Sequence, residues 1–353
     1  MADEFCKNLS NSVYFQEKDG DLFYQPCCWA PLSIIPVRSK VDLLMARTKT
    51  TKEVKQDTEK NCKECLGREK NGFAFSHRIS ANKDIPDSAK LGDPYILTLQ
   101  VDTTCNAACV TCGPHFSSLW KKQIDPHATL STYDLQYQKI FETTDFDNLQ
   151  KILFLGGEPL LSSHNVEVLK RVKTPEKVAL SYTTNGSVFP SDEVLTLWRK
   201  FKAINIVFSI DGTTDQFEYI RWPISWKKIN ENLSRFSEIA SDSKFTLTIN
   251  STINPLNIMY FENLESWSKS YPFARVLTSA CYGTWGVDAT PLKMRRYVEE
   301  RYGSNHKLVG LLNSYPEQPH KFPLLLAHAA ELDSKRGLDY KEVFKEALKI
   351  INN

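Results

Sequence analysis

From residue 95 onward, short runs of apolar and β-branched residues alternate with longer segments in which apolar positions recur every three or four residues. The first pattern predicts strands and the second predicts helices. The strand candidates are Tyr95–Val101, Lys151–Leu155, Val178–Tyr182, Ile204–Ile210, Phe245–Asn250 and Arg275–Ser279. The helix candidates are Tyr133–Phe141, His164–Val172, Ser191–Phe201, Ser225–Ile239, Ile258–Ser268 and Pro291–Tyr302. The alternation predicts right-handed strand–helix–strand units and a parallel sheet.

Six such units predict an α/β fold, a partial TIM-type (β/α)6 barrel rather than a closed eightfold one. A doubly wound open sheet is the alternative, because the sequence does not fix how the sheet closes. We predict three segments: a small cysteine-rich module over 1–90, the barrel over 91–290 and a helical extension over 291–353. The extension either caps the barrel or contacts a partner.

Composition excludes several classes of protein. The 353 residues carry a formal net charge of +2, with 41% hydrophobic and 24% charged residues, which is typical of a globular chain and not of a disordered or collagenous one. The basic stretch 47–70 is balanced by acidic residues, so we expect a solvated surface and no nucleic-acid partner. Neither a secretory signal nor a membrane-spanning apolar run is visible, and we expect a cytoplasmic protein without a membrane partner.

The nine cysteines are unevenly placed, which points to metal or redox chemistry rather than disulfides. Three of them form the run Cys105-Asn-Ala-Ala-Cys109-Val-Thr-Cys112 directly after a predicted strand. Three thiolates on one loop can bind three irons of a cubane cluster and leave the fourth iron open, as a catalytic site requires. A Cys3His zinc site completed by His115 is the alternative.

The second motif is Gly156-Gly157-Glu158-Pro159, at the end of the next predicted strand. Glycines at a strand end let the backbone approach a ligand, and the Glu158 carboxylate can accept an ammonium group. In a barrel of parallel strands this end lies on the same face as the cysteine loop. The placement favours a cofactor site over the zinc alternative.

Taken together, these motifs resemble the radical S-adenosylmethionine superfamily over roughly residues 95–285. Two further strand-end motifs agree, Thr184-Asn185-Gly186 and Ser209-Ile-Asp211-Gly212, and all four follow the family's order. Many members carry an aromatic residue just before the third cysteine, whereas this chain has Thr111. That departure concerns the adenine contact and not the cluster.

The resemblance implies two cofactors, a [4Fe-4S] cluster and S-adenosylmethionine, and a one-electron reductant such as flavodoxin or ferredoxin. Cys105, Cys109 and Cys112 would bind the cluster, and the methionine end of S-adenosylmethionine would chelate the fourth iron. The remaining positions carried over by motif or by place at a strand end would bind S-adenosylmethionine: Gly156, Gly157 and Glu158 at the methionine ammonium, Asn185 and Ser209 at the ribose or carboxylate, Arg221 at the carboxylate and Asn250 at the ribose. For Arg221 a surface arginine is the alternative, and for Asn250 an ordinary strand-end turn.

The N-terminal cysteines form a third constellation: Phe5-Cys6, Asp19-Gly20-Asp21, Pro26-Cys27-Cys28 and Cys62-Lys-Glu-Cys65. Four spaced thiolates in a turn-rich module predict a second metal site. The pattern resembles the SPASM/twitch auxiliary-cluster region of the same superfamily, which implies Cys6, Cys27, Cys62 and Cys65 as ligands of an auxiliary iron–sulfur cluster. Cys28 either replaces Cys27 or packs inertly, and a plain zinc knuckle is the alternative.

Near the sixth predicted strand, Cys281 is expected to be a buried free thiol; the alternative places it at the active-site mouth. Nearby Tyr282, Trp285 and Asp288 are candidates for substrate contact, with core packing as the alternative. The resemblance implies an enzyme that cleaves S-adenosylmethionine to a 5′-deoxyadenosyl radical and abstracts hydrogen from a substrate. By analogy with proteins that carry the auxiliary module, a ribosomal peptide is the leading substrate, and a nucleotide or other small metabolite is the alternative. A zinc-stabilised binding protein or an electron carrier is the non-enzymatic alternative.

Overall fold

The computed structural model describes residues 6–70, 76–89 and 93–352. Its eight strands follow the order β2-β1-β3-β4-β5-β6-β7-β8, so β2 and β8 are edges and the sheet does not close. The pairs β3–β4, β4–β5 and β7–β8 are parallel. The predicted α/β class with an incomplete barrel is confirmed. The strands are β1 Ser12–Lys18, β2 Asp21–Gln25, β3 Ile96–Gln100, β4 Lys151–Phe154, β5 Ala179–Thr184, β6 Ala203–Ser209, β7 Phe245–Ile253 and β8 Phe273–Ala280.

All six predicted strands are present, as β3 to β8, with their ends shifted by a few residues. The helices are α1 Asn8–Asn11, α2 Lys40–Gln56, α3 Thr58–Asn61, α4 Lys63–Lys70, α5 His77–Asp84, α6 Ser118–Ile124, α7 Asp134–Thr143, α8 Ser163–Arg171, α9 Asp192–Trp198, α10 Thr214–Ile220, α11 Trp226–Ile239, α12 Phe261–Ser268, α13 Leu292–Tyr302, α14 Lys307–Asn313, α15 Lys321–Arg336, α16 Tyr340–Val343 and α17 Lys345–Asn352. None of the helices in the described ranges is long and apolar enough to cross a membrane.

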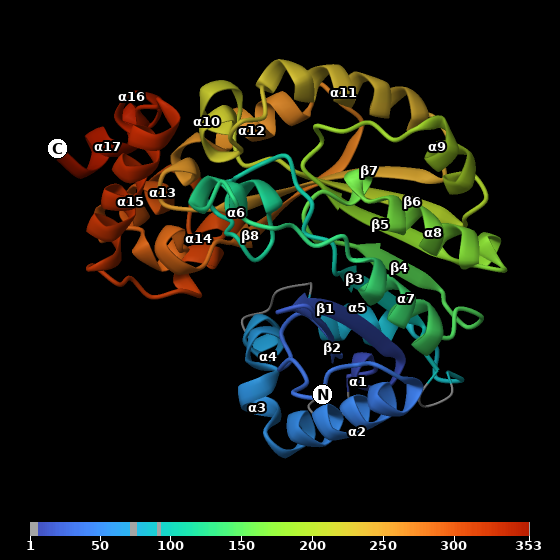
Figure 1. Cartoon of the computed structure of the whole chain (residues 1–353). Coiled ribbons are helices and arrows are strands. Elements are labelled where there is room, and N and C mark those ends of the chain that lie inside the picture. Colours follow the sequence, from blue (N-terminus) through green and yellow to red (C-terminus); the bar gives the residue numbers. More distant parts are fainter. Residues whose placement is uncertain (1–5, 71–75, 90–92, 353) are drawn as a thin grey trace. The chain divides into compact units, whose positions relative to one another are not determined.

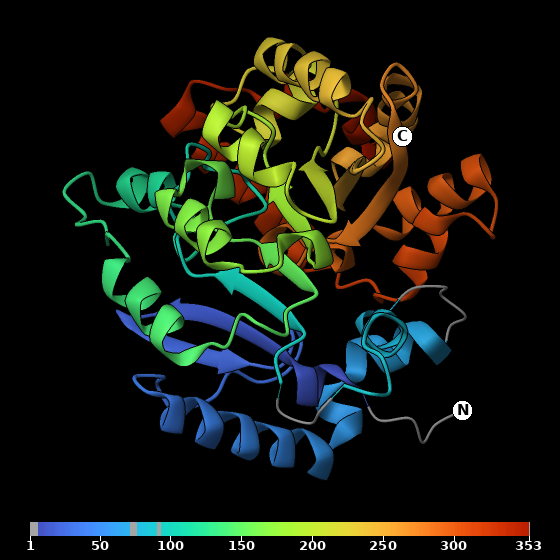
Figure 2. The ribbon, with the colours of Figure 1, turned by 90° about the vertical axis from the view of Figure 1, so that its right-hand side faces the viewer.

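The N-terminal residues contribute two strands that the sequence pattern did not predict. β1 and β2 form an antiparallel hairpin around Asp19 and Gly20, whose φ angles of 53° and 86° suit a tight hairpin turn. β1 also pairs with β3 in parallel, from Ser12 opposite Ile96 to Gln16 opposite Gln100. Figure 2 shows the two blue strands beside the teal strand β3. The N-terminal segment therefore extends the same sheet.

Helix α2 packs along this hairpin (Figure 1). Ser39 caps it by accepting a hydrogen bond from the Asp42 N–H. Its buried residues follow a helical spacing of three and four: Leu43, Ala46, Thr50 and Val54. The pattern was hidden in the sequence because apolar Val41 and Leu44 are exposed while polar Thr50 lies on the buried face.

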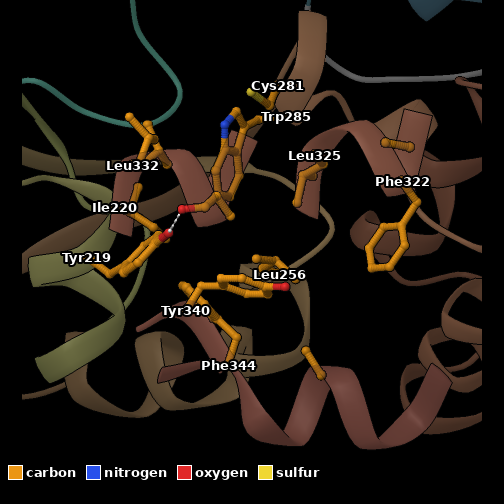
Figure 3. Packing of buried hydrophobic residues seen from close by; sticks show 14 of the residues in the cluster. Tyr219, Ile220, Leu256, Cys281, Trp285, Phe322, Leu325, Leu332, Tyr340 and Phe344 are labelled. Carbon is orange, nitrogen blue, oxygen red and sulfur yellow. Dashed lines mark hydrogen bonds between the residues drawn. The ribbon is translucent and has the colours of Figure 1, made fainter. Parts of the chain in front are cut away.

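The chain divides into two compact units, residues 1–104, 128–182 and 190–204 in the first, and 105–127, 183–189 and 205–353 in the second. In the second unit, α15, α16 and α17 share a hydrophobic core with α6, α10 and the segment after β8. Figure 3 shows Leu332, Tyr340 and Phe344 of this C-terminal segment packed with Tyr219, whose ring meets that of Phe344 edge to face at 5.2 Å. The helical tail predicted from the sequence is therefore an integral part of this core.

Candidate functional site

The cysteine loop 105–112 follows β3 and is anchored by the first turn of α6. The Ser118 hydroxyl accepts a hydrogen bond from the Cys105 N–H at 3.0 Å. The Ser117 hydroxyl donates to the Ala107 carbonyl at 2.6 Å and also caps the helix. A pair of serines at a helix start therefore fixes the first half of the loop.

The second half of the loop is bound to the segment that follows α10. The Ala108 N–H donates to the Trp222 carbonyl at 2.7 Å, and the Val110 N–H donates to the Ile220 carbonyl at 2.9 Å. These two bonds lie on either side of Cys109. The backbone that carries this cysteine is thus held in place by the protein itself.

Cys109 is the most deeply buried of the three loop cysteines, with 6% of its surface exposed. The Arg221 guanidinium donates to its sulfur at 3.7 Å and pairs with the Asp211 carboxylate at 2.6 Å. Asp211 is in turn fixed by the Thr252 N–H at 2.7 Å. Burial raises the pKa of the Cys109 thiol, and the Arg221 charge opposes that rise. A cationic group therefore lies beside the thiol that would carry negative charge as a metal ligand.

The structure places Arg221 away from the surface, with 11% of its side chain exposed, so the surface-arginine alternative is wrong. Its Nε is buried and has no hydrogen-bond partner within the described part of the chain. An unpaired buried donor is costly, and a bound anionic group would satisfy it. The donor set and this orphaned N–H fit a negatively charged cluster or the carboxylate of its ligand.

Replacing Asp211 with asparagine is expected to lower the free energy of unfolding by about 3–5 kcal/mol. The substitution leaves the buried Arg221 charge without its counter-ion, while the hydrogen bond from Thr252 can be kept. Urea denaturation measures the effect, with the exposed Glu299→Gln on α13 as the matched control. A loss below about 1 kcal/mol, the range of surface pairs, would contradict this view of the ion pair.

The glycine motif belongs to the first unit and lies against the end of β3. The Gly157 N–H donates to the Asp102 carbonyl at 3.0 Å, and the Glu158 N–H donates to the Thr104 carbonyl at 2.8 Å. A Cβ on Gly156 would lie 2.4 Å from the Asp102 oxygen, and one on Gly157 would lie 2.2 Å from the Thr104 oxygen. The glycines are therefore required by backbone packing beside Cys105, whatever ligand approaches them.

Glu158 is 1% exposed and its carboxylate accepts a hydrogen bond from the Leu160 N–H at 3.1 Å. It thereby caps the short 3-10 turn Pro159–Leu161. The sequence assigned this carboxylate to an ammonium group, and the structure adds a local capping role.

A polar network joins the cysteine loop to the end of β5. Asn185 donates to the Asn106 amide oxygen at 2.9 Å and accepts hydrogen bonds from the backbone and side chain of Ser187. Asn106, between the first two cysteines, donates to the Ser187 hydroxyl at 2.8 Å. The sequence singled out Asn185 but missed Asn106, whose one available signal was its position inside the cysteine run.

The last two predicted residues lie on neighbouring parts of the second unit. Ser209 is the final residue of β6 and is half-buried. Asn250 lies three residues before the end of β7, because that strand continues to Ile253, and its amide oxygen accepts a hydrogen bond from Ser279 at 2.8 Å. Asn250 is therefore not in a strand-end turn.

Cys281 is buried, with 3% exposed, and belongs to the hydrophobic core of the second unit. Trp285 packs in the same core, as expected if it has a packing role rather than a substrate contact. Its indole N–H donates to the His328 ring at 3.0 Å. Tyr282 is exposed, and Asp288 pairs with Lys321 at 2.5 Å.

In the N-terminal module, the four predicted ligands Cys6, Cys27, Cys62 and Cys65 line one cavity. Burial, together with the smaller effect of the other three thiols, raises the pKa of Cys6 to about 12, so the four interact electrostatically. Cys28 does not line this cavity. Instead it lines a neighbouring one of about 110 Å³, with Cys27 in the walls of both. Phe5, part of the sequence pattern, lies outside the described residues.

Among the residues that the structure describes, no group of three His, Cys, Asp or Glu side chains is arranged to hold a metal ion. The thiols of Cys6, Cys27, Cys62 and Cys65 share the walls of one cavity. His77 also lines this cavity and was missed by the sequence analysis. Burial lowers its pKa, which favours the neutral imidazole.

The fold is of the α/β class, and the loop after one of its strands carries three cysteines, the residue type that binds iron–sulfur clusters. Residues 100–267 match the family model described as "Radical SAM superfamily". This segment of the chain is a radical SAM domain, and enzymes of that superfamily use a [4Fe-4S] cluster and S-adenosylmethionine.

Among curated proteins, the chain is similar to "GTP 3',8-cyclase" from Petrotoga mobilis, with 26% identity over 163 residues, 46% of this chain and 45% of that protein. It is also similar to "GTP 3',8-cyclase" from Desulforamulus reducens, with 27% identity over 117 residues, 33% of this chain and 34% of that protein. The matches span less than half the length of these relatives.

Among solved structures, Streptococcus suis SuiB bound to S-adenosylmethionine matches with 13% identity and a TM-score of 0.40, over 83% of this chain and 67% of that one. Native anSMEcpe with bound AdoMet and Cp18Cys peptide matches with 12% identity and a TM-score of 0.38, over 63% of this chain and 62% of that one. Similarity at this level carries no argument about activity.

Proposed function

We propose that Cys105, Cys109 and Cys112 bind the [4Fe-4S] cluster of this radical S-adenosylmethionine enzyme. The observation that carries the proposal is the anchored loop, with backbone bonds on both sides of Cys109 and a guanidinium 3.7 Å from its sulfur. Cys105, Cys109 and Cys112 would hold the cluster, which would supply the one electron needed to break the sulfur–C5′ bond of S-adenosylmethionine, giving methionine and a 5′-deoxyadenosyl radical able to abstract hydrogen from the substrate.

The protein's own residues bind and orient these groups. Arg221, fixed by Asp211, offers a buried positive charge and an unused N–H to the cluster or to the carboxylate of S-adenosylmethionine. Asn106 and Asn185 hold the loop against the end of β5. We assign Gly156, Gly157 and Glu158 to the methionine ammonium, and Ser209 and Asn250 to the ribose side.

We further propose that Cys6, Cys27, Cys62 and Cys65 bind an auxiliary iron–sulfur cluster. The shared cavity supports this assignment, and the exclusion of Cys28 from it favours Cys27 as the ligand. Such a cluster would accept the electron left on the substrate or bind the substrate directly. The intact thiols that both sites need are consistent with a cytoplasmic location and a flavodoxin- or ferredoxin-like reductant.

Changing both Cys62 and Cys65 to alanine is expected to halve the iron content, from about eight to about four irons per chain. Cleavage of S-adenosylmethionine should persist, because the loop at Cys109 is untouched. Iron analysis of anaerobically prepared protein measures the change, and Cys28→Ala is the matched control with full iron. Unchanged iron in the double variant would rule out these ligands.

Two substrate classes remain, each supported by a different observation. A ribosomal peptide follows from the resemblance of the N-terminal module to auxiliary-cluster regions. A purine nucleotide is favoured by the curated relatives, which are GTP 3',8-cyclases. We keep the peptide as the leading proposal and the nucleotide as the second.

The test is anaerobic incubation with dithionite and S-adenosylmethionine, followed by measurement of 5′-deoxyadenosine and methionine in equal amounts. Adding GTP, or a pool of synthetic peptides, should raise 5′-deoxyadenosine formation only for the right class. Stimulation by GTP alone would replace the peptide proposal. Absence of 5′-deoxyadenosine from iron-loaded protein would overturn the proposed reaction.

A further inference from the structure

Arg336 is the last residue of α15, where Gly337 ends the helix in a left-handed conformation with φ 67° and ψ 37°. From this position its Nη2 donates to the Ala108 carbonyl at 2.8 Å and to the Gln123 side chain at 2.9 Å. Ala108 directly precedes Cys109. A residue of the C-terminal tail, more than two hundred positions away in sequence, thus contacts the cysteine loop.

Two tryptophans enclose this guanidinium. Its central carbon lies 4.9 Å from the ring centres of both Trp120 and Trp222. The same tryptophans bind the loop directly, since the Trp120 indole donates to the Cys109 carbonyl at 2.8 Å and the Trp222 carbonyl accepts from Ala108. Arg336, Trp120 and Trp222 therefore form one clamp around the Ala108–Cys109 peptide.

The Nε and Nη1 of Arg336 are buried without a hydrogen-bond partner in the ranges that the structure describes. Its bond to the Ala108 carbonyl places the positive charge of Arg336 next to the Cys109 residue. Arg221 is the second guanidinium beside this cysteine. The Cys109 thiol is thus influenced by two buried positive charges from distant parts of the chain.

We propose that Arg336 is a positioning residue for the cluster loop and that its charge favours the reduced, more negative state of the cluster. The inference rests on the proposed role of Cys109 as a cluster ligand. It gives the C-terminal segment a function in the redox site, beyond its packing in the core. A positive charge near the cluster stabilises the added electron, and the clamp keeps Cys109 in place as the cluster binds.

The test uses reconstituted holoenzyme and three variants: Arg336→Gln, Arg336→Lys and, as control, the neighbouring exposed Lys335→Gln. One readout is the midpoint potential of the cluster whose EPR signal changes on adding S-adenosylmethionine. The other is the rate of iron loss to a chelator. We expect R336Q to lower the equilibrium constant for one-electron reduction about tenfold, which corresponds to ~59 mV, and to lose iron several-fold faster. R336K should retain the potential but lose iron faster.

Wild-type potential and wild-type iron loss in R336Q would overturn the proposal. If R336Q fails to fold by circular dichroism, R336K decides: faster iron loss supports the clamp, and an unchanged rate overturns it. A wild-type protein without any EPR signal that responds to S-adenosylmethionine would instead refute the proposed cluster ligands, so the two failures are distinguishable.

Discussion

Cys109→Ala is expected to reduce 5′-deoxyadenosine formation to the level found without enzyme. Cys109 is the buried member of the loop trio, and the bonds of Ala108 and Val110 fix its backbone. With one of three protein ligands removed, the cluster loses its most shielded attachment, and the Arg221 donor loses the sulfur it contacts at 3.7 Å. The measurement is 5′-deoxyadenosine per iron in anaerobic protein with dithionite.

Cys281→Ala is the matched control for this prediction, because Cys281 is also a buried thiol of the second unit but lies in its hydrophobic core. It should keep its iron and its activity, with a small loss of stability of about 1 kcal/mol from the lost sulfur. Turnover retained by Cys109→Ala at the level of Cys281→Ala would eliminate Cys109 as a ligand.

Gly157→Ala is expected to lower the free energy of unfolding by about 3 kcal/mol and to reduce iron loading. The added Cβ would lie 2.2 Å from the Thr104 oxygen and 2.7 Å from the Thr103 carbonyl carbon. Moving these backbones apart breaks the hydrogen bonds at Gly157 and Glu158, each worth about 1 kcal/mol. Because Thr104 precedes Cys105, the displacement would also disturb the first ligand.

Gly67→Ala serves as the control in the same unit. Gly67 lies inside α4, and a Cβ there would meet nothing within 4 Å. The substitution should stabilise the helix by about 0.5–1 kcal/mol. Chemical denaturation of both variants, with iron analysis, checks the prediction; equal stabilities would mean that the close approach of Gly157 to Thr104 does not exist in solution.

The sequence predicted the six strands β3 to β8 because each is a short apolar run between turn residues or helical patterns. It did not predict β1 and β2, since runs of this length beside dense turn residues become strands only by pairing, β1 with β3 and β2 with β1. Helix α2 was missed for a similar reason, because its buried face includes Thr50 and its exposed face includes Leu44.

Sequence motifs singled out the cysteines and the glycines, which stand at strand ends or in a recognisable spacing, and Arg221, which follows one of those motifs. They gave no role to Asp211, although it lies in the motif Ser209-Ile-Asp211-Gly212. Its partner Arg221 is ten residues further along the chain, and the two side chains meet only in the folded protein. Arg336 had no sequence signal at all. Its contact with Ala108 depends on how α15 packs in the core of the second unit.

The most direct test of the central claim is the iron and zinc content per chain of anaerobically prepared protein. Two cubane clusters, one on the loop at Cys105, Cys109 and Cys112 and one in the N-terminal cavity, predict about eight irons and no zinc. Zinc without iron, even after attempted cluster reconstitution, would contradict both sites and leave a zinc-stabilised binding protein.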